Sequence, residues 1–393
     1  MKPVVTVIAE SESANLGDRA IVQAISQYLS EYSKVRLFSL SNSKLTSASK
    51  NYSNKKFFHI RDIIKKCGRI APVTLRSRVR WYLLGERRRY QRLVENQVVG
   101  SSVILIGGGQ LIKNNAALFC DRLAVIARVA AHQNVPYSLF GVGVDRKMSF
   151  LTWRIVKNTI INAKTVFVRD LQSKNRILTQ YPCGVACKII PDLAFALRSE
   201  KAAYLSRDTE YAINIMSVPP MIEALPKSIK LSAADIRDMW YSVILLLAER
   251  GAAPVIFTTG SPEDLREAQD MQIRLRAKAG ISVELIHPAS VEELQSLLSQ
   301  FQNVLASRMH AGILAYILGC NTLCLNWDDK VKGVWTTVSQ ESRVVEIESL
   351  TGPEGAECLL QKFANSYVPT VENIFEVSRM VRARLKAELI DRI

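Results

Sequence analysis

The chain has 393 residues, of which 48% are hydrophobic and 22% are charged; this is typical of globular proteins, and the length fits two domains rather than one. It contains no run of about 18 apolar residues, so we expect no transmembrane helix. The first residues, MKPVVTVIAESES, lack the apolar stretch and cleavage site of a signal peptide, which favours a cytoplasmic protein. The seven cysteines form no C-x2-C pair, so we expect ordinary buried thiols and no metal site.

The net charge of +16 is concentrated in residues 41–100, which hold fifteen Lys or Arg against three Asp or Glu, a net charge of +12. Within this segment, RSRVRWYLLGERRRYQRLV (Arg76–Val94) mixes arginines with aromatic and aliphatic residues. Three interpretations stay open: a solvated arginine-rich helix, a helix on the anionic inner face of the plasma membrane, or a grip on an acidic glycan. No nucleic-acid-binding motif accompanies the charge, so we expect no nucleic acid as a partner.

In the first half of the chain, short apolar runs alternate with longer helical patterns. A strand at Val4–Ala9 leads through a polar loop into a helix. Further strands are predicted at the ranges Lys34–Leu40, Ser102–Gly109, Pro136–Val144 and Ala163–Asp170. Apolar strands alternating with helices predict a parallel sheet that helices cover on both faces.

The same plan starts again at Glu210–Ser217, and the last forty residues have the pattern of two helices. We therefore predict an α/β protein with two Rossmann-like domains facing a cleft, which is the default ligand site. The first domain covers residues 1–200 with the basic insertion at about 41–100. The second covers residues 201–345, and residues 346–393 form C-terminal helices that pack across the junction.

Ligands of parallel α/β sheets bind beyond the carboxyl ends of the strands, so the residues after each strand are the candidate site residues. Asn15, Gly17 and Asp18 lie between the first strand and its helix. They are either a turn with Asp18 as the helix N-cap or a loop whose amides and carboxylate face the cleft.

Two glycine clusters and one arginine follow the later strands of the first domain. Gly107, Gly108 and Gly109 come at the end of one strand, and GVGVD comes at the end of the next. Glycine allows positive φ and close approach of a ligand to the backbone, but neither cluster matches the dinucleotide fingerprint. Arg169 follows another strand, where it is either a surface arginine paired with a carboxylate or a ligand-binding group.

In the second domain, SRMHAGILAYILG (Ser307–Gly319) places Ser307, Arg308 and His310 at a strand end and a helix start. A helix N-terminus favours anions, so cationic side chains carry a local cost there unless an anion lies between them and the helix. Phosphate and carboxylate match the arginine fork, and a histidine beside a bound anion can act as an acid. Lys330, near another strand end, is a further candidate ligand of the same anion.

Five short motifs, in this order and spacing, resemble those of the polysaccharide pyruvyl transferases. They are N-x-G-D, GGG, R-D-x-x-S, P-D and S-R-x-H-A, here at Asn15–Asp18, Gly107–Gly109, Arg169–Ser173, Pro191-Asp192 and Ser307–Ala311. The resemblance runs from about residue 5 to about residue 335. The basic segment 41–100 has no counterpart motif.

This resemblance implies a GT-B-like fold, phosphoenolpyruvate as donor substrate, no cofactor, and a sugar acceptor, with a lipid-linked oligosaccharide as one candidate. The product is a pyruvate ketal on a cell-surface polysaccharide or its precursor. Arg169, Arg308 and His310 are implied to bind phosphoenolpyruvate. We expect His310 to act as the acid and Asp18 as a candidate base for the acceptor hydroxyl.

Two other functions stay open at the level of sequence. A GT-B glycosyltransferase that uses a nucleotide sugar shares the fold, and a helix N-terminus can also hold a diphosphate. A non-catalytic glycan- or membrane-binding protein could keep the fold without turnover. The R-x-H pair together with a distant arginine favours a small dianion over a nucleotide, and every motif position carries the expected residue, which argues against an inactive enzyme.

Overall fold

The computed structural model describes residues 2–41, 73–115, 118–182, 184–197, 209–352 and 354–390. The chain divides into two compact units. Unit 1 consists of Met1–Ser13, Ser26–Ile190 and Arg384–Ile393, and unit 2 of Ala14–Ile25 and Pro191–Ala383. The sequence predicted a single change of domain near residue 200; in the structure the first part of one N-terminal helix also groups with the second unit.

Unit 1 is built on a parallel six-stranded sheet in the order β2-β1-β3-β4-β5-β6. Helix α1 (Leu16–Ser30) follows the first strand and belongs to both units. The strands are β1 (Val4–Ala9), β2 (Lys34–Ser39), β3 (Val103–Ile112), β4 (Tyr137–Val144), β5 (Val166–Val168) and β6 (Cys187–Ile189). The helices are α4 (Val73–Leu83), α5 (Glu86–Val98), α6 (Phe119–His132), α7 (Phe150–Ile161), α8 (Leu171–Gln180) and a π-helical turn, η5 (Lys386–Ile390).

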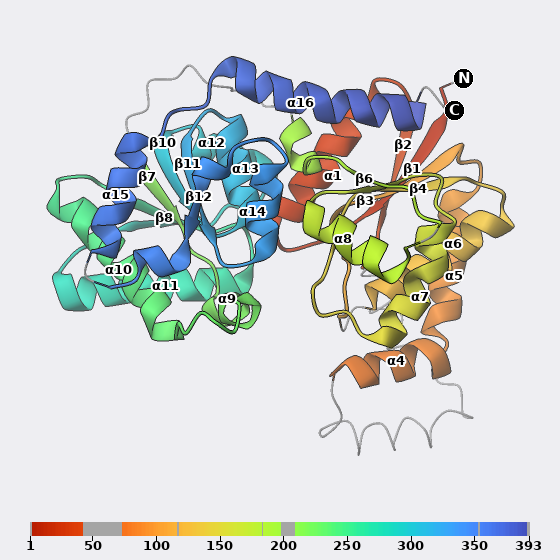
Figure 1. Ribbon diagram of the computed structural model, residues 1–393, viewed down its shortest axis with the longest axis horizontal. Helices are drawn as coiled ribbons and strands as arrows, with labels where there is room; N and C mark the ends of the chain where they lie inside the picture. Colours follow the sequence, from red (N-terminus) through yellow and green to blue (C-terminus); the bar gives the residue numbers. More distant parts are fainter. Residues whose placement is uncertain are drawn as a thin grey trace. The chain divides into compact units, whose positions relative to one another are not determined.

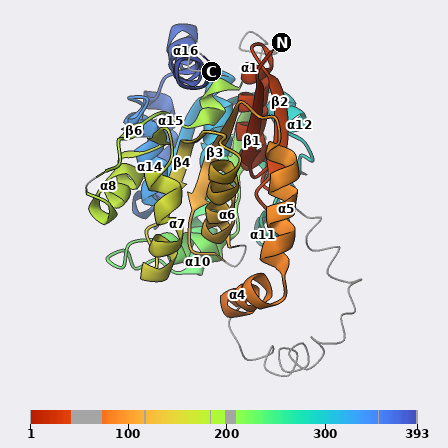
Figure 2. The same cartoon turned by 90° about the vertical axis from the view of Figure 1, so that its right-hand side faces the viewer.

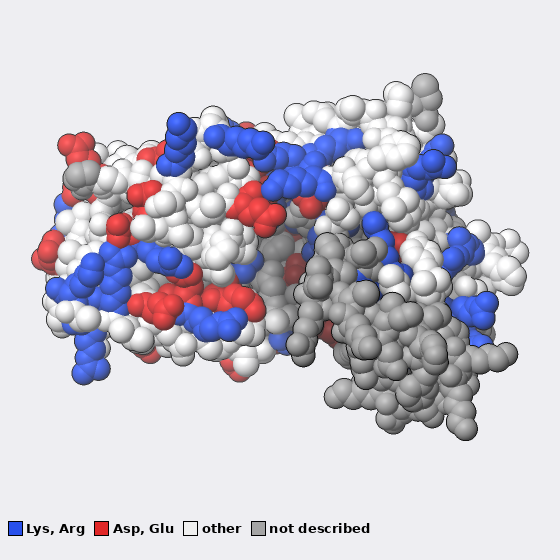
Figure 3. All heavy atoms as spheres, turned by 90° about the horizontal axis from the view of Figure 1, so that it is seen from below, with Lys and Arg blue, Asp and Glu red and all other residues white. Residues whose placement is uncertain are grey.

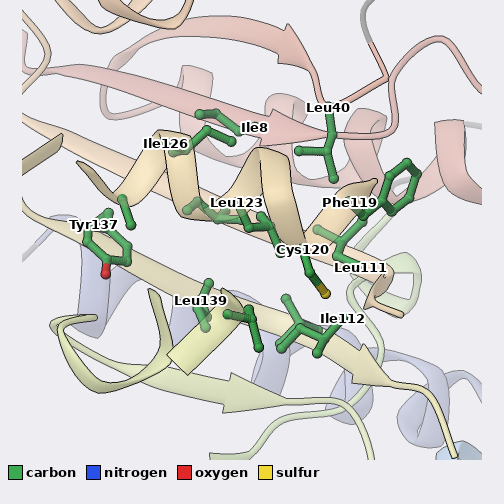
Figure 4. Close-up of a cluster of buried hydrophobic side chains, with 14 of the residues drawn as sticks. Ile8, Leu40, Leu111, Ile112, Phe119, Cys120, Leu123, Ile126, Tyr137 and Leu139 are labelled. Carbon is green, nitrogen blue, oxygen red and sulfur yellow. The ribbon is translucent and has the colours of Figure 1, made fainter. Parts of the chain in front are cut away.

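Helices α5, α6 and α7 lie side by side along this sheet, and α4 lies across their lower ends (Figures 1 and 2). Strands β3 and β4 are buried on both faces, as their continuous apolar sequences predicted, whereas the edge strand β2 is partly exposed. Figure 4 shows Cys120 and Leu123 of α6 packed among Ile8, Ile112 and Leu139 of the sheet. This apolar core holds the strand ends of unit 1 in fixed positions.

The predicted end of the third strand is wrong in one respect. Gly107–Gly109 do not follow β3 but lie inside it, and the strand continues to Ile112. Gly108 and Gly109 have φ of 77° and 79°, and the register with β4 shifts between Gly109 and Ile112. The glycines therefore form an irregularity within the strand, and in the sequence such an irregularity looks like a strand end.

Unit 2 has a second parallel six-stranded sheet, in the order β12-β11-β10-β7-β8-β9. Its strands are β7 (Thr209–Asn214), β8 (Val255–Phe257), β9 (Glu284–Ile286), β10 (Phe301–Ala306), β11 (Asn321–Asn326) and β12 (Val344–Glu346). Its longer helices are α9 (Val218–Ala224), α10 (Ala233–Glu249), α11 (Pro262–Ala279), α12 (Val291–Leu298), α13 (Met309–Ile317), α14 (Asp329–Thr336), α15 (Gly355–Asn365) and α16 (Val371–Leu385), the last ending in unit 1. Short 3-10 turns are η2 (Leu193–Ala196), η3 (Glu341–Arg343) and η4 (Ile347–Leu350).

Local signals explain where these helices begin and end. Helix α10 starts with a capping box in which Ser232 and Asp235 bond each other's backbone N–H, and Gly251 beyond its end has φ of 82°. Helix α11 starts with Pro262 and ends at Gly280, which has φ of 69°. The two predicted series of strands and helices, and the two predicted C-terminal helices, are confirmed.

The described surface carries side chains of both charges. Over α10 and α11, acidic and basic side chains are interspersed (Figure 3), with ion pairs such as Arg237–Glu267 and Arg274–Asp238. Of the basic segment, the structure describes residues 73–100 as α4 and α5, and residues 42–72 lie outside the described part. In the described chain, no helix is both long and apolar enough to span a bilayer.

Candidate functional site

The strand order of unit 2 reverses between β7 and β10. These two strands are neighbours at the centre of the sheet, and the chain leaves them toward opposite edges. Ligands of open α/β sheets bind at this switch point, beyond the carboxyl ends of the strands. The strands end there at Asn214 and Ala306, and Ser307, Arg308 and His310 follow directly.

Ser307 ties the three strands at the switch point together. Its hydroxyl donates to the carbonyl of Asn214 at 2.6 Å, and its own carbonyl accepts from the indole Nε1 of Trp327 at 2.6 Å. The backbone N–H of Arg308 donates to Oδ1 of Asn214 at 2.8 Å. Ser307 is only 1% exposed, so the structure gives its side chain a bracing contact at a position predicted to bind substrate.

Arg308 is the N-cap residue of α13, and its guanidinium already grips a carboxylate. Nε and Nη2 donate to the two oxygens of Asp264 at 2.9 and 2.7 Å. Asp264 is fully buried and also accepts from the backbone N–H of Ser217 at 2.9 Å. The protein itself thus supplies an anion that offsets the cost of a cation at this helix start, and the fork is held in a fixed orientation.

His310, in the first turn of α13, has a similar internal partner. Its Nε2 lies 3.5 Å from Oδ2 of Asp192, and its side chain is 9% exposed while that of Asp192 is fully buried. On the other side, Gly17 of α1 lies so close that a Cβ there would fall 2.4 Å from Nδ1 of the ring. The imidazole is therefore held between a carboxylate and a bare backbone.

The loop before α1 is ordered by Asn15. Its Oδ1 accepts from the backbone N–H of Gly17 at 3.2 Å and from Oγ1 of Thr259 at 3.4 Å. The backbone N–H of Leu16 donates to the carbonyl of Thr259 at 2.8 Å. Asn15 rather than Asp18 occupies the capping position, which corrects the predicted turn, and Asp18 lies half-buried in the first helical turn.

Lys330 lies at the neighbouring strand end and is engaged locally. Its Nζ is 3.1 Å from Oδ2 of Asp328 and 4.5 Å from the centre of the Trp327 ring. Since Trp327 bonds Ser307, the start of α14 adjoins the start of α13. Lys330 is thus close in the fold to the predicted anion site, with its charge partly balanced by Asp328.

Arg169 lies in unit 1, at the end of β5. It is 2% exposed, its Nε is 3.5 Å from Oδ2 of Asp170, and it packs on Gly143 of β4, where a Cβ would fall 2.8 Å from Nε. Asp170 caps α8 by accepting from the backbone N–H of Ser173 at 2.6 Å. The hydroxyl of Ser173 accepts from the N–H of Val144 at 2.9 Å, so the R-D-x-x-S motif fastens α8 to the end of β4.

The structure therefore divides the predicted site residues between the units. Around the start of α13, unit 2 brings together the positions that were far apart in sequence: Asn15, Gly17, Asp18, Ser307, Arg308, His310 and Lys330. Arg169 and Gly107–Gly109 belong to unit 1. The sequence analysis missed Asp264, although its position shortly after a strand could have marked it as a candidate. It noted Asp192 only as part of a motif.

Most of the described cysteines are buried thiols. Cys120, Cys187, Cys320 and Cys324 are free and buried. Burial raises the pKa of the Cys120 and Cys324 thiols to about 12, which keeps them protonated and unreactive near neutral pH. Within the described ranges no group of three or more His, Cys, Asp or Glu is placed to hold a metal ion. Cys183, which sequence paired with Cys187, lies outside the described residues.

A family model for polysaccharide pyruvyl transferases matches residues 15–329 of the chain. The protein belongs to the polysaccharide pyruvyl transferase family. The matched range includes every predicted site residue except Lys330. No curated protein sequence matches this member of the family.

Several solved structures share the fold of this pyruvyl transferase family member. UDP-GlcNAc 2-epimerase from Methanocaldococcus jannaschii is 10% identical with a TM-score of 0.59, covering 98% of this chain and 99% of that one. The UDP-GlcNAc 2-epimerase from Neisseria meningitidis, solved with UDP-GlcNAc bound, is 12% identical with a TM-score of 0.54, covering 99% of this chain and all of the other. The predicted GT-B-like fold of two Rossmann-like units is confirmed.

Proposed function

We propose that the protein is a phosphoenolpyruvate-dependent pyruvyl transferase that forms a pyruvate ketal on two hydroxyls of a sugar. The acceptor belongs to a cell-surface polysaccharide, such as an exopolysaccharide or capsule, or to its precursor. The observation that carries the proposal is the pair Arg308 and His310 at the N-terminus of α13, at the switch point of the second sheet, in a chain of this family.

The chemistry needs an acid and cationic groups. A proton adds to the methylene carbon of phosphoenolpyruvate, and the adjacent carbon gains oxocarbenium character. One sugar hydroxyl attacks that carbon, and a second hydroxyl then displaces phosphate. One of the two hydroxyl protons restores the acid that protonated the methylene carbon, and the other leaves with the phosphate. The reaction therefore consumes no further reagent.

Four of the predicted residues have a role in this scheme. Protonated His310 donates the proton to the methylene carbon, and Asp18 accepts a proton from the acceptor hydroxyl. Arg308 binds the donor through the N–H groups that Asp264 leaves open, with the fork already oriented. Arg169, assigned to the donor by its motif, supplies the second cation for a substrate that carries both phosphate and carboxylate.

The decisive test is a thermal-shift titration with phosphoenolpyruvate. A ligand that binds only the folded state raises the melting temperature by mass action. Because Arg308→Ala leaves the buried Asp264 without its partner, this variant should be less stable by about 1–3 kcal/mol before any ligand is added. The matched control is therefore Arg308→Ala with Asp264→Asn, and the quantity compared is the shift caused by phosphoenolpyruvate in each protein.

We expect a shift for the wild type and none for either Arg308 variant. His310→Gln should keep the shift and lose turnover with any acceptor, since its role is proton transfer rather than donor binding. If UDP stabilises the wild type and phosphoenolpyruvate does not, the protein is instead a nucleotide-sugar glycosyltransferase. If His310→Gln keeps most of its turnover, the acid role assigned to this residue is wrong.

The proposal includes an anionic membrane surface as the place of action, with a lipid-linked oligosaccharide as acceptor. Helix α4 supports this with an exposed basic and apolar end: the Arg80 side chain is 55% exposed, Tyr82 48% and Leu83 57%. Such a combination gains from both charge and apolar burial on anionic lipid. The protein would then be cytoplasmic and peripheral on the inner face of the plasma membrane.

A further inference from the structure

Asp192 has one carboxylate oxygen for the backbone and one for His310. Oδ1 accepts from the N–H of Ala194 at 3.0 Å and so caps the short turn η2. Oδ2 is 3.5 Å from Nε2 of His310. Because the first oxygen is fixed by the cap, the second is held toward the imidazole and does not need to be steered by the substrate.

The turn that carries Asp192 is itself fastened to the helix that carries His310. Phe195 of η2 makes edge-to-face contacts with Tyr316 of α13 and Trp335 of α14, with ring centres 6.0 and 5.8 Å apart. The two rings it meets also contact each other, at 5.5 Å. All four residues of η2 are buried. This aromatic packing fixes the separation between the carboxylate and the imidazole at both ends.

Gly17 closes the opposite side of the imidazole. A Cβ at this position would fall 2.4 to 2.6 Å from Nδ1, Cβ and Cγ of His310, so Gly17 adjoins the Nδ1 edge of the ring and only a residue without a side chain fits there. With Nε2 directed at a carboxylate, Nδ1 is the nitrogen left for exchange with a substrate.

From this geometry we propose that Asp192 is a positioning residue that holds the proton of neutral His310 on Nε2, so that His310 gives and receives its catalytic proton through Nδ1. The inference rests on the proposed acid role of His310. At 3.5 Å, Nε2 and Oδ2 are within ion-pair range and slightly beyond hydrogen-bond distance, and the carboxylate favours the neutral tautomer with its proton on the nearer nitrogen.

Asp192→Asn tests this proposal directly, because the hydrogen bond from the N–H of Ala194 fixes the orientation of the new amide. The N–H of Ala194 needs an acceptor, so the amide oxygen takes the place of Oδ1 and the NH2 group faces His310. That NH2 donates to Nε2 and forces the proton of the neutral ring onto Nδ1. The variant thus keeps the cap and reverses the tautomer.

The first readout is the 15N spectrum of histidine-labelled protein without any substrate, at alkaline pH where imidazoles are neutral. The chain has four histidines, and the His310→Gln spectrum assigns the signal of interest. We expect Nε2–H in the wild type and Nδ1–H in Asp192→Asn. An Nδ1–H tautomer in the wild type overturns the proposal, even if the variant does not fold.

The second readout is turnover. Asp192→Asn should lower kcat by about 10²- to 10⁴-fold, the usual contribution of a positioned acid, with KM for phosphoenolpyruvate unchanged. The matched control is Asp235→Asn at the start of α10, where a carboxylate also bonds a helix-start N–H but no histidine is paired with it. This control should keep kcat.

The two proposals fail in different ways. If the tautomer reverses but no preparation binds phosphoenolpyruvate or forms a ketal, the positioning by Asp192 holds and the proposed function falls. If ketal formation is measured and Asp192→Asn keeps both the wild-type tautomer and the wild-type kcat, the function holds and the positioning role falls.

Discussion

Gly17 and Gly143 are among the glycines that a neighbouring side chain requires, rather than their own backbone angles. Gly17 leaves room for His310 and Gly143 leaves room for Arg169, and neither has a positive φ. Sequence reasoning treats glycine near a strand end as a source of positive φ or of space for a ligand. Here the space is taken by the side chains proposed to act on the donor.

Gly17→Ala should therefore affect activity more than stability alone explains. The new Cβ would fall 2.4 Å from Nδ1 of His310, so the ring must move away from its place beside Asp192. We expect a loss of kcat together with a destabilisation of about 1–3 kcal/mol from overpacking. Steady-state kinetics and urea denaturation measure the two effects.

The control for this variant is Gly280→Ala at the end of α11. Its φ is 69° and a Cβ there would meet nothing within 4 Å. Alanine should cost about 1–2 kcal/mol through its left-handed backbone and leave kcat as in the wild type. Equal kcat losses in the two glycine variants would show that the effect of Gly17→Ala is general loss of stability.

At the scale of elements, β3 and α4 show where patterns mislead and where they hold. The glycines of β3 were taken for a strand end, because the pattern of residues does not show that a strand can continue through an irregularity. The arginine-rich run, for which the sequence left three interpretations open, forms α4 and α5 in its described part. Exposure changes sharply at the end of α4: Trp81 is buried, whereas Tyr82 and Leu83, which follow it, are exposed.

The exposed end of α4 should bind anionic lipid. We expect the protein to float with vesicles that contain phosphatidylglycerol and not with vesicles of phosphatidylcholine alone, and less so at high salt. Leu83→Glu should abolish flotation. Ile273→Glu, which changes an equally exposed aliphatic residue of α11 (66% exposed), should not. Flotation that is the same for wild type and Leu83→Glu would remove α4 as the contact.

At the scale of the whole molecule, the sequence predicted the two sheets because short strands with an apolar stretch alternate with helices. It also pointed to the loops that follow strands as candidate site loops, because ligands of parallel α/β sheets bind there. It did not predict the partners Asp192 and Asp264, because each reaches the start of α13 through the fold and not through a spacing along the chain. Predictions of charge at a helix start therefore need the tertiary structure to tell an internal carboxylate from a substrate.

Both units carry a buried thiol whose titration should weaken the fold at alkaline pH. Burial raises the pKa of Cys120 in unit 1 and of Cys324 in unit 2 to about 12, against about 8.5 in an unfolded chain. Between these values the unfolded chain loses protons that the folded protein keeps, so the free energy of unfolding falls as pH rises from about 8.5 toward 12.

Urea denaturation at pH 7.5 and pH 10 measures this loss. The wild type should show a lower midpoint at pH 10, and the double variant Cys120→Ala, Cys324→Ala should show a smaller difference between the two pH values. An unchanged difference in the double variant would assign the alkaline sensitivity to other groups.

Because α1 is divided between the units, the second unit consists of two separate segments of the chain. A polypeptide that starts at Pro191 would contain Asp192, Arg308 and His310 but not the stretch Ala14–Ile25 that covers the imidazole. Such a fragment would lack the backbone that adjoins Nδ1 of His310, and a peptide carrying Asn15 and Gly17 would have to supply it in trans. The smallest self-sufficient version of this half of the enzyme is therefore a fusion of two separate pieces of the chain.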